Sequence, residues 1–207
     1  MWTIALLALS LHANVKPSAA QSTKAADLAP GKLLVASRDL QDPNFAKTVV
    51  ILLQCDDDGI VGLIVNRRSK VAVSRVVNAV PGAKTRTDPV YAGGPVDTTD
   101  VLALARITPP TGDVQRVFSD VFLVSTKRSL EKTFASKIEP GMVRVYLGYA
   151  GWTKPQLENE VALGAWYIFQ ASVKAVFDTD PDSLWERLIR ETEMRVASLR
   201  AENRVAQ

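Results

Sequence analysis

Two apolar runs rich in β-branched residues, separated by a short acidic turn, constrain the fold more than any other part of this sequence. The runs cover residues 48–55 and 60–66, and the turn between them reads Asp56-Asp57-Asp58-Gly59. Acidic residues and glycine tolerate the positive φ angles of a tight turn, so the segment predicts a β-hairpin. Because both runs are almost continuously apolar, we expect this strand pair to be buried on both faces.

Shorter strands and helices are expected along the rest of the chain, in no regular order. Apolar and β-branched runs predict strands at 32–37, 90–92, 101–107, 114–118, 121–125, 143–149 and 165–171. Spacing and end signals predict helices at 71–80, at 129–138, from Thr153 onward, and from Asp180 to about 199. Because helices and strands do not alternate one by one, the pattern indicates an α+β fold and not a doubly wound parallel sheet.

Residues 1–20 have the features of a secretory signal peptide. An apolar stretch at 2–11 is followed by Ser18-Ala19-Ala20, whose small residues fit signal-peptidase cleavage before Gln21. The stretch is shorter than the ~20 apolar residues that span a bilayer. We therefore expect export to the periplasm or beyond, with no transmembrane anchor after leader removal. Because no Lys or Arg precedes the apolar stretch, the alternative is a mis-assigned start or a disordered apolar tail on a cytoplasmic protein.

The chain after the leader is predicted to be one domain with two short appendages. Residues 21–30 are small and polar, and we expect a flexible tether there. Residues 31–199 form the single domain, which is long enough for a sizeable core. From about residue 200 the last helix loses its apolar stripe, so residues 200–207 are expected to fray as a C-terminal tail.

Charge and residue counts exclude several classes of function. The formal net charge is only +3 and the basic residues are scattered, so nucleic acid is not an expected partner. The only histidine, His12, lies in the leader, and Cys55 is the only cysteine. Without the leader the chain cannot supply a Ser-His-Asp or Cys-His catalytic set, a histidine-ligated metal site or a compact zinc site. We expect no metal.

Four short segments with special backbone or packing demands supply the candidate site. They are Asp42-Pro43-Asn44-Phe45, Gly62-Leu63-Ile64-Val65-Asn66-Arg67, Gly93-Gly94-Pro95-Val96 and Leu147-Gly148-Tyr149-Ala150-Gly151-Trp152. Their polar residues and glycines fall at strand ends, where binding sites tend to lie. We expect these loops to converge on one polar cleft, and we assign no catalytic residue. The ligand-binding candidates are Asp42, Asn44, Asn66, Arg67, Gly93, Gly94, Tyr149 and Trp152.

Each segment also has a purely structural interpretation. Asp42 can cap a turn while Phe45 fills the core, and we favour this over a catalytic carboxylate. Asn66 can tie down a neighbouring loop instead of contacting a ligand, and both interpretations stay open. The paired glycines fit a tight turn more commonly than an anion-holding nest of amides. Tyr149 and Trp152 combine large apolar surfaces with polar tips.

Taken in order, the four segments resemble the AlgH/YqgE-like family from residue 31 to about residue 185. Further matches are Gly31-Lys32-Leu33-Leu34-Val35-Ala36, Thr48-Val49-Val50, Gln156-Leu157-Glu158 and Phe177-Asp178. The resemblance implies an α+β fold whose mixed sheet curls into a bifurcated pseudo-barrel flanked by helices. It implies no cofactor and no established enzymatic activity, and members usually carry the label of transcriptional regulators. The chain departs from the family pattern at Arg68, Leu53, Cys55 and Ala105, where relatives often carry proline, cysteine, histidine and histidine in turn.

Three classes of function are compatible with the sequence. We favour a non-catalytic binding or regulatory module, in which the planar guanidinium of Arg67 takes a small anionic ligand or an acidic peptide. A carboxylate-based hydrolase or transferase is the second, with Asp42 or Asp178 as a general base whose pKa is raised by burial. A DNA-associated transcriptional regulator is the third, and it requires that the protein is not exported. The sequence does not set the oligomeric state.

Overall fold

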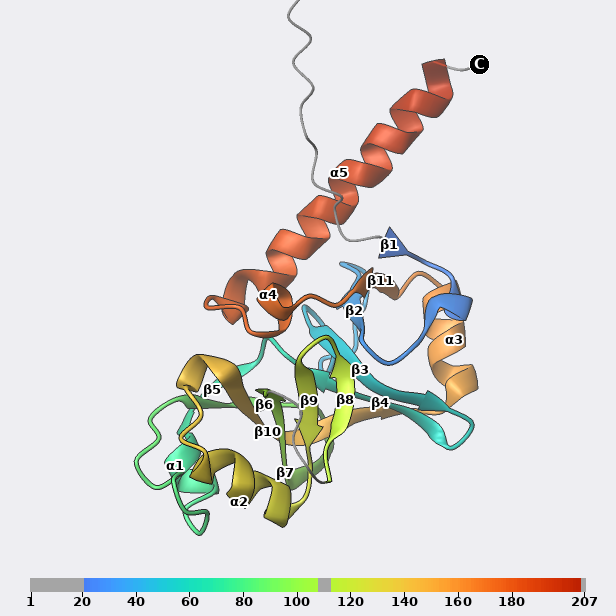
Figure 1. The fold of residues 1–207 in the computed structure, drawn as a ribbon. Coiled ribbons are helices and arrows are strands. Elements are labelled where there is room, and N and C mark those ends of the chain that lie inside the picture. Colours follow the sequence, from blue (N-terminus) through green and yellow to red (C-terminus); the bar gives the residue numbers. More distant parts are fainter. Residues whose placement is uncertain (1–20, 108–112, 206–207) are drawn as a thin grey trace, which may run out of the picture.

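The computed structural model describes residues 21–107 and 113–205 (Figure 1). The expected signal peptide, residues 1–20, lies outside the described residues, as do the last two residues of the expected tail. The strands are β1 (Gln21–Ser22), β2 (Lys32–Ala36), β3 (Val49–Asp56), β4 (Gly59–Ile64), β5 (Arg68–Ala72), β6 (Pro89–Ala92), β7 (Val96–Arg106), β8 (Gln115–Phe118), β9 (Val121–Val124), β10 (Val143–Trp152) and β11 (Trp166–Gln170). The α-helices are α1 (Val73–Val76), α2 (Lys127–Ala135), α3 (Lys154–Ala162), α4 (Val173–Val176) and α5 (Leu184–Val205), and the 3-10 helices are η1 (Ala25–Asp27), η2 (Pro140–Met142) and η3 (Pro181–Ser183).

One mixed sheet organises the molecule, in the strand order β1-β11-β2-β3-β4-β10-β7-β9-β8, with β6 paired to β10 and β5 to β6. The sheet divides at β10, because residues 150–152 pair with β4 whereas residues 143–149 pair with β7. The register shifts between Leu147 and Tyr149, where Gly148 has a φ of 67° that glycine adopts without a side-chain clash. The α+β fold and the curled, bifurcated sheet flanked by helices are therefore confirmed (Figure 1).

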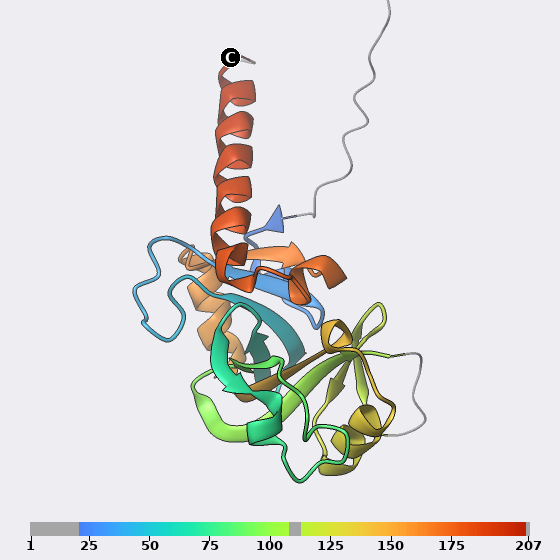
Figure 2. The same ribbon diagram turned by 90° about the vertical axis from the view of Figure 1, so that its left-hand side faces the viewer.

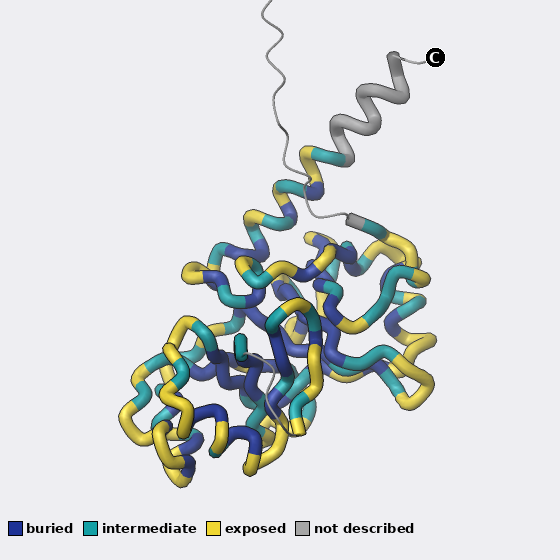
Figure 3. The backbone as a smooth tube through the Cα atoms, in the orientation of Figure 1, coloured by how far each residue is buried: buried dark blue, intermediate teal, exposed yellow. Residues whose placement is uncertain are grey.

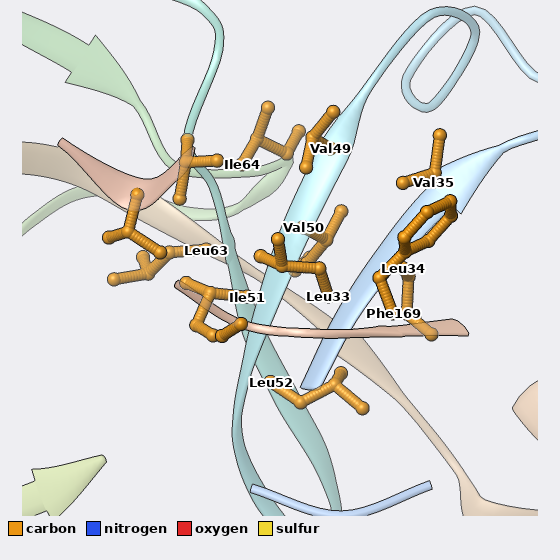
Figure 4. Close-up of a cluster of buried hydrophobic side chains, with 14 of the residues drawn as sticks. Leu33, Leu34, Val35, Val49, Val50, Ile51, Leu52, Leu63, Ile64 and Phe169 are labelled. Carbon is orange, nitrogen blue, oxygen red and sulfur yellow. The ribbon is translucent and has the colours of Figure 1, made fainter. Parts of the chain in front are cut away.

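The expected hairpin is confirmed as β3 and β4, which pair antiparallel and turn between Asp56 and Gly59. Apolar side chains of both strands are buried together with those of β2 and with Phe169 of β11 (Figure 4). Burying one such side chain stabilises the fold by ~1.5–3 kcal/mol. The continuous apolar pattern of the two runs therefore reflects a strand pair at the centre of the larger core.

A second, smaller core lies between the helices α1 and α2 and the strands β6, β7 and β10. Val143 and Val145 of β10 face this core, whereas Tyr146 faces the larger one, as the alternation of a strand requires. Phe134 of α2 and Val73 of α1 pack against these valines. Buried residues therefore occur in both the larger and the smaller core (Figure 3).

Several elements differ from the sequence prediction. The helix expected at 71–80 is shorter than predicted, because β5 ends at Ala72 in a pair with Pro89 of β6 and only Val73–Val76 is helical. The strands expected at 101–107 and 143–149 are longer and run as β7 and β10. Residues 21–30, expected as a free tether, include β1, which pairs with β11, and η1, which packs on α3.

The helix α5 starts against the sheet and then projects away from it (Figures 1 and 2). Its first turns bury Leu184, Trp185 and Ile189, and Nε1 of Trp185 donates a hydrogen bond to the carbonyl of Ala36 at 2.8 Å. Helical backbone continues past residue 200 to Val205. In the described part of the chain, no helix has the length and apolar character needed to cross a membrane.

Candidate functional site

The loop between β2 and β3 is tied to the end of β4 by Asn66. Oδ1 of Asn66 accepts a hydrogen bond from the amide of Val49 (2.8 Å), and its Nδ2 donates to the carbonyl of Lys47 (3.0 Å). Lys47 has a φ of 59°, an uncommon conformation for a residue with a side chain. Because Asn66 is buried and both ends of its amide are occupied, its structural interpretation holds.

Arg67 holds the same loop from the exposed side. Its Nη2 donates to the carbonyls of Pro43 (3.1 Å) and Ala46 (3.4 Å), and the guanidinium is half-buried. Nε and Nη1 donate to no acceptor among the residues that the structure describes. Burial lowers the pKa of Arg67 from its ordinary value, and the nearby carboxylate of Asp42 acts in the opposite direction. Arg67 is thus a partly desolvated cation with free donors.

Asp42 and Asn44 form the exposed tip of this loop. Oδ1 of Asp42 accepts a hydrogen bond from the amide of Asn44 (2.8 Å), and the carbonyl of Asp42 accepts the amide of Phe45 (2.9 Å). This is the turn-capping role expected for the aspartate. The tip is therefore an ordered turn that presents one carboxylate and one amide side chain to solvent.

Phe45 anchors the loop in the larger core. Its ring stacks on Trp152 with centroids 5.1 Å apart and meets Trp166 edge-on at 5.7 Å. Such aromatic pairs contribute ~0.5–1.5 kcal/mol beyond the area that they bury. Trp152, a candidate ligand contact on sequence, is itself buried in this group of three rings. Trp152 supports the loop from inside the core and does not line the surface of the loop.

Gly93 and Gly94 lie where two backbone segments pass very close to each other. A Cβ atom on Gly93 would overlap the carbonyl oxygen of Gly148, and one on Gly94 would overlap the backbone of Tyr149. The amide of Gly93 already donates to the carbonyl of Leu147 (2.8 Å). Close backbone packing explains this pair of glycines, and the Gly93 amide is not available to an anion.

Tyr149 points to a different partner from the other candidates. Its hydroxyl donates to Oδ2 of Asp97 at 3.0 Å, and this hydrogen bond is the main cause that raises the pKa of Tyr149. Asp97 has a φ of 43°, again uncommon for a residue with a side chain. The contact joins β7 and β10 beside the point where the sheet divides.

The eight candidate residues thus separate into groups. Asp42, Asn44, Asn66 and Arg67 gather around one exposed loop, which we call the β2–β3 loop. Gly93 lies alongside, because the amide of Ala92 donates to the carbonyl of Arg67 at 2.9 Å. Gly94 packs on the backbone of β10, Tyr149 turns to β7, and Trp152 sits in the core.

Arg144 of β10 is a buried arginine that the sequence did not indicate as part of the site. Its guanidinium donates to the carbonyls of Val65 (3.3 Å) and Asp178, and it lies over the rings of Tyr91 (4.7 Å) and Phe177 (5.8 Å). Both hydrogen-bond acceptors are main-chain oxygens, so the arginine joins the end of β4 to the segment before α5. The signal was a charged residue inside the apolar strand Val143–Trp152.

Asp178 lies beside this arginine but is fully engaged. Its Oδ1 accepts the amide of Asp180 (2.8 Å), and its Oδ2 accepts Nη2 of Arg187 (2.8 Å). Both carboxylate oxygens of Asp178 are thus held by partners within the fold. The geometry therefore gives Asp178 a structural role at the start of α5.

Cys55 is a half-buried thiol near the hairpin turn. Desolvation raises its pKa to about 11, and the neighbouring Asp56 adds to the effect. Such a thiol is protonated at neutral pH and is a poor nucleophile. Within the described residues, no group of three or more His, Cys, Asp or Glu side chains is placed to hold a metal ion.

The chain is similar in sequence to one protein family and to several of its members. Residues 33–197 match the model of the family described as AlgH-like. A UPF0301 protein of Chlorobaculum parvum is 34% identical over 164 residues, which cover 79% of this chain and 86% of that protein. A UPF0301 protein of Azoarcus sp. is 37% identical over 163 residues, which cover 75% of this chain and 83% of that protein.

Solved structures show the same fold. The solution structure of the AlgH protein from Pseudomonas aeruginosa matches with a TM-score of 0.63 and 27% identity, over 79% of this chain and 87% of that one. The crystal structure of a Corynebacterium diphtheriae protein matches with a TM-score of 0.67 and 23% identity, over 80% of this chain and 87% of that one.

Proposed function

The chain belongs to the AlgH-like family, and from that premise we propose that it is a non-catalytic binding or regulatory module. Its ligand would be a small anion or an acidic peptide, held by Arg67 beside the β2–β3 loop. The free donors of Arg67 are the observation that carries this proposal. One nitrogen of the guanidinium fixes the loop, and the others face no acceptor among the described residues.

The environment of Arg67 favours binding of one negative charge. Partial burial strengthens its electrostatic interactions, because fewer water molecules screen them. A free N–H group of the guanidinium can donate one charge-assisted hydrogen bond to an oxygen of a carboxylate. The ordered loop also reduces the entropy that binding must overcome.

The carboxylate of Asp42 restricts which anions fit. It lies close enough to Arg67 to influence the pKa of the guanidinium, and so it repels a second negative charge at this position. The favoured ligand therefore carries one carboxylate next to a hydrogen-bond donor. An aspartate or glutamate side chain within a peptide has this combination, since its own backbone supplies the donor.

The environments of the side chains that could act as nucleophile or base favour a binding role over a catalytic one. The Cys55 thiol has a pKa raised to about 11, and both oxygens of Asp178 accept hydrogen bonds within the fold. Oδ1 of Asp42 is occupied by the turn. The environments of Cys55 and Asp178 thus oppose a role as nucleophile or base, and Asp42 has the turn-capping role.

Titration calorimetry with the acetylated peptide Ala-Glu-Ala amide and with succinate as probes tests the proposal. We expect the Arg67→Gln variant to bind the peptide about tenfold more weakly or worse, because a hydrogen bond to a charged group is worth ~1.5–3 kcal/mol. Arg116→Gln, at an exposed arginine that donates to the carbonyl of Ser119, is the control. Peptide binding that is absent from the unmodified protein, or unchanged in Arg67→Gln, would contradict the proposal.

A second variant tests the effect of the Asp42 charge on anion binding while the turn of the loop is kept. Asp42→Asn keeps the oxygen that accepts the Asn44 amide but removes the negative charge next to Arg67. We expect this variant to bind succinate more tightly than the unmodified protein. Equal or weaker succinate binding would show that Asp42 does not face the ligand.

A further inference from the structure

A cavity of about 280 Å³ lies between the β3–β4 hairpin, η1 and α3. Leu28 and the alanines of η1 form one wall, Cys55 and Ile60 of the hairpin form the floor, and two charged residues of α3 lie at the third side. In Figure 1 the N-terminal segment runs beside α3 above the hairpin. Part of the expected tether is thus a wall of this η1–α3 cavity.

The two charged residues, Lys154 and Glu158, are four positions apart on α3 and line the same cavity. Residues at this spacing are neighbours on a helix, but lysine before glutamate is the weaker order for pairing. Nζ of Lys154 lies 3.3 Å from Oδ1 of Asp57, a side chain that is fully exposed. Glu158 makes no hydrogen bond or ion pair with any residue that the structure describes.

The cavity therefore offers one cation, one unpaired carboxylate and an apolar floor. An ion pair with an exposed partner is worth little, so Lys154 can exchange Asp57 for another carboxylate at small cost. A volume of 280 Å³ is just below the ~300–1,000 Å³ of pockets that take drug-sized ligands. It suits a molecule no larger than a single amino acid.

We propose that the η1–α3 cavity binds a free apolar α-amino acid. Glu158 receives the ammonium group, Lys154 receives the carboxylate, and the ligand's side chain packs on Leu28 and Ile60. The charges of the ligand complement the two charged residues in sign and in number. No covalent step is involved, because the Cys55 thiol in the floor stays protonated and adds apolar surface. The proposal does not depend on the function of Arg67.

The wall made by η1 gives binding a structural consequence. This segment is held by the pairing of β1 with β11, by the hydrogen bond between Ser22 and Asp27, and by the amide of Leu28 donating to the carbonyl of Ala25 at 3.0 Å. A ligand in the cavity adds contacts with Leu28. Binding is therefore expected to protect the amides of residues 25–28 from hydrogen exchange.

Titration calorimetry on the full chain with L-alanine, L-valine, L-leucine and L-phenylalanine tests the proposal. We expect at least one of them to bind. Its amide, which lacks the carboxylate, and the matching carboxylic acid without the amino group should each bind at least about tenfold more weakly. Binding of none of the four, or equal binding of either analogue, would overturn the proposal.

Variants locate the site. Glu158→Gln and Lys154→Gln should each weaken binding at least about tenfold, whereas Glu131→Gln and Lys127→Gln should leave it unchanged. Lys127 and Glu131 have the same spacing on α2, where they pair with each other at 3.9 Å. Arg67→Gln should also leave amino-acid binding unchanged, which keeps this test separate from that of Arg67.

Alkylation of Cys55 by iodoacetamide supplies a readout inside the cavity. A saturating concentration of the amino acid should slow the reaction, because the ligand covers the thiol in the floor. An unchanged alkylation rate with a ligand that binds would place the ligand elsewhere and overturn the assignment.

Discussion

Nη2 of Arg67 donates a hydrogen bond to the carbonyl of Pro43 across 3.1 Å, so the residue that follows a buried strand also fixes an exposed loop. The rest of the same guanidinium has no acceptor among the described residues. A single side chain can therefore order a recognition loop and still contribute donors to a ligand.

Removing the amide of Asn66 should destabilise the protein. In Asn66→Ala the buried amide of Val49 and the carbonyl of Lys47 lose their partner, and an unsatisfied buried group costs ~1–3 kcal/mol. Urea denaturation measures the free energy of unfolding. Asn44→Ala, at the exposed tip of the same loop, is the control and should stay within ~0.5 kcal/mol. Equal effects of the two substitutions would refute the anchoring role of Asn66.

Phe45 should be the largest single contributor to the position of the β2–β3 loop. Phe45→Ala empties the space between Trp152 and Trp166 and should cost ~3–5 kcal/mol in unfolding free energy. Phe45→Leu keeps most of the apolar volume and should cost less. Thermal unfolding followed by tryptophan fluorescence checks the order of the two variants, and a loss below ~1 kcal/mol for Phe45→Ala would mean that the ring is not part of the core.

Gly93 should not tolerate a side chain. In Gly93→Ala the added Cβ overlaps the carbonyl oxygen of Gly148, and the strand beside it cannot move without breaking the pairing of β10. We expect the variant to be insoluble or strongly destabilised. Gly141→Ala is the matched control, since nothing lies within 4 Å of its Cβ position. The two circular dichroism melts should differ clearly, and coincident melts would contradict the close backbone approach.

The Cys55 thiol should ionise only at high pH. Its pKa is raised to about 11, against an ordinary value of about 8.5, so the thiolate fraction and the alkylation rate should stay low at pH 8 and rise near pH 11. The folded state keeps its proton over the pH range in which the unfolded state loses it. Its contribution to stability is therefore present below pH ~8.5 and is lost as pH rises toward 11. An alkylation midpoint near 8.5 would show an exposed, unperturbed thiol.

Export predicts a shortened protein. Cleavage after Ala20 would leave Gln21 as the first residue, and Gln21 is also where β1 begins its pairing with Phe169 of β11. Intact-mass measurement on protein recovered from the native host should give a chain that starts at Gln21, in a fraction outside the cytoplasm. A full-length chain in the cytoplasm would rule this prediction out.

Turn residues and helix-start residues in the sequence predicted those elements whose position depends on neighbouring residues. The acidic turn at 56–59 and the proline-containing starts of α3 and η3 lie where expected, because turn and cap residues act on their immediate neighbours. The helix expected at 71–80 is limited to Val73–Val76, because residues 71 and 72 belong to β5, which pairs with β6, and valine-rich sequence has a weak helical preference.

The site was less predictable, because its contacts join distant segments. Arg144 reaches Val65, 79 positions away, and Asp178, 34 positions away, and nothing near it in the sequence indicates either partner. The sequence predicts a turn at Gly93, and only the structure shows that the backbone of Gly148 lies beside it. Asn66 and Arg67 lie at a strand end, as the sequence predicts, but nothing in the sequence indicates their contacts with the β2–β3 loop.

Nuclear magnetic resonance of the arginine Nε–H groups tests the central claim most directly. Titrating the acetylated Ala-Glu-Ala amide into labelled protein should shift the Nε–H resonance of Arg67 together with the amide of Asn44, since both lie at the β2–β3 loop. Resonances of Arg116, which donates to Ser119 in β8–β9, should stay fixed. Shifts confined to other residues, with Arg67 unmoved at saturating peptide, would contradict a binding site at Arg67.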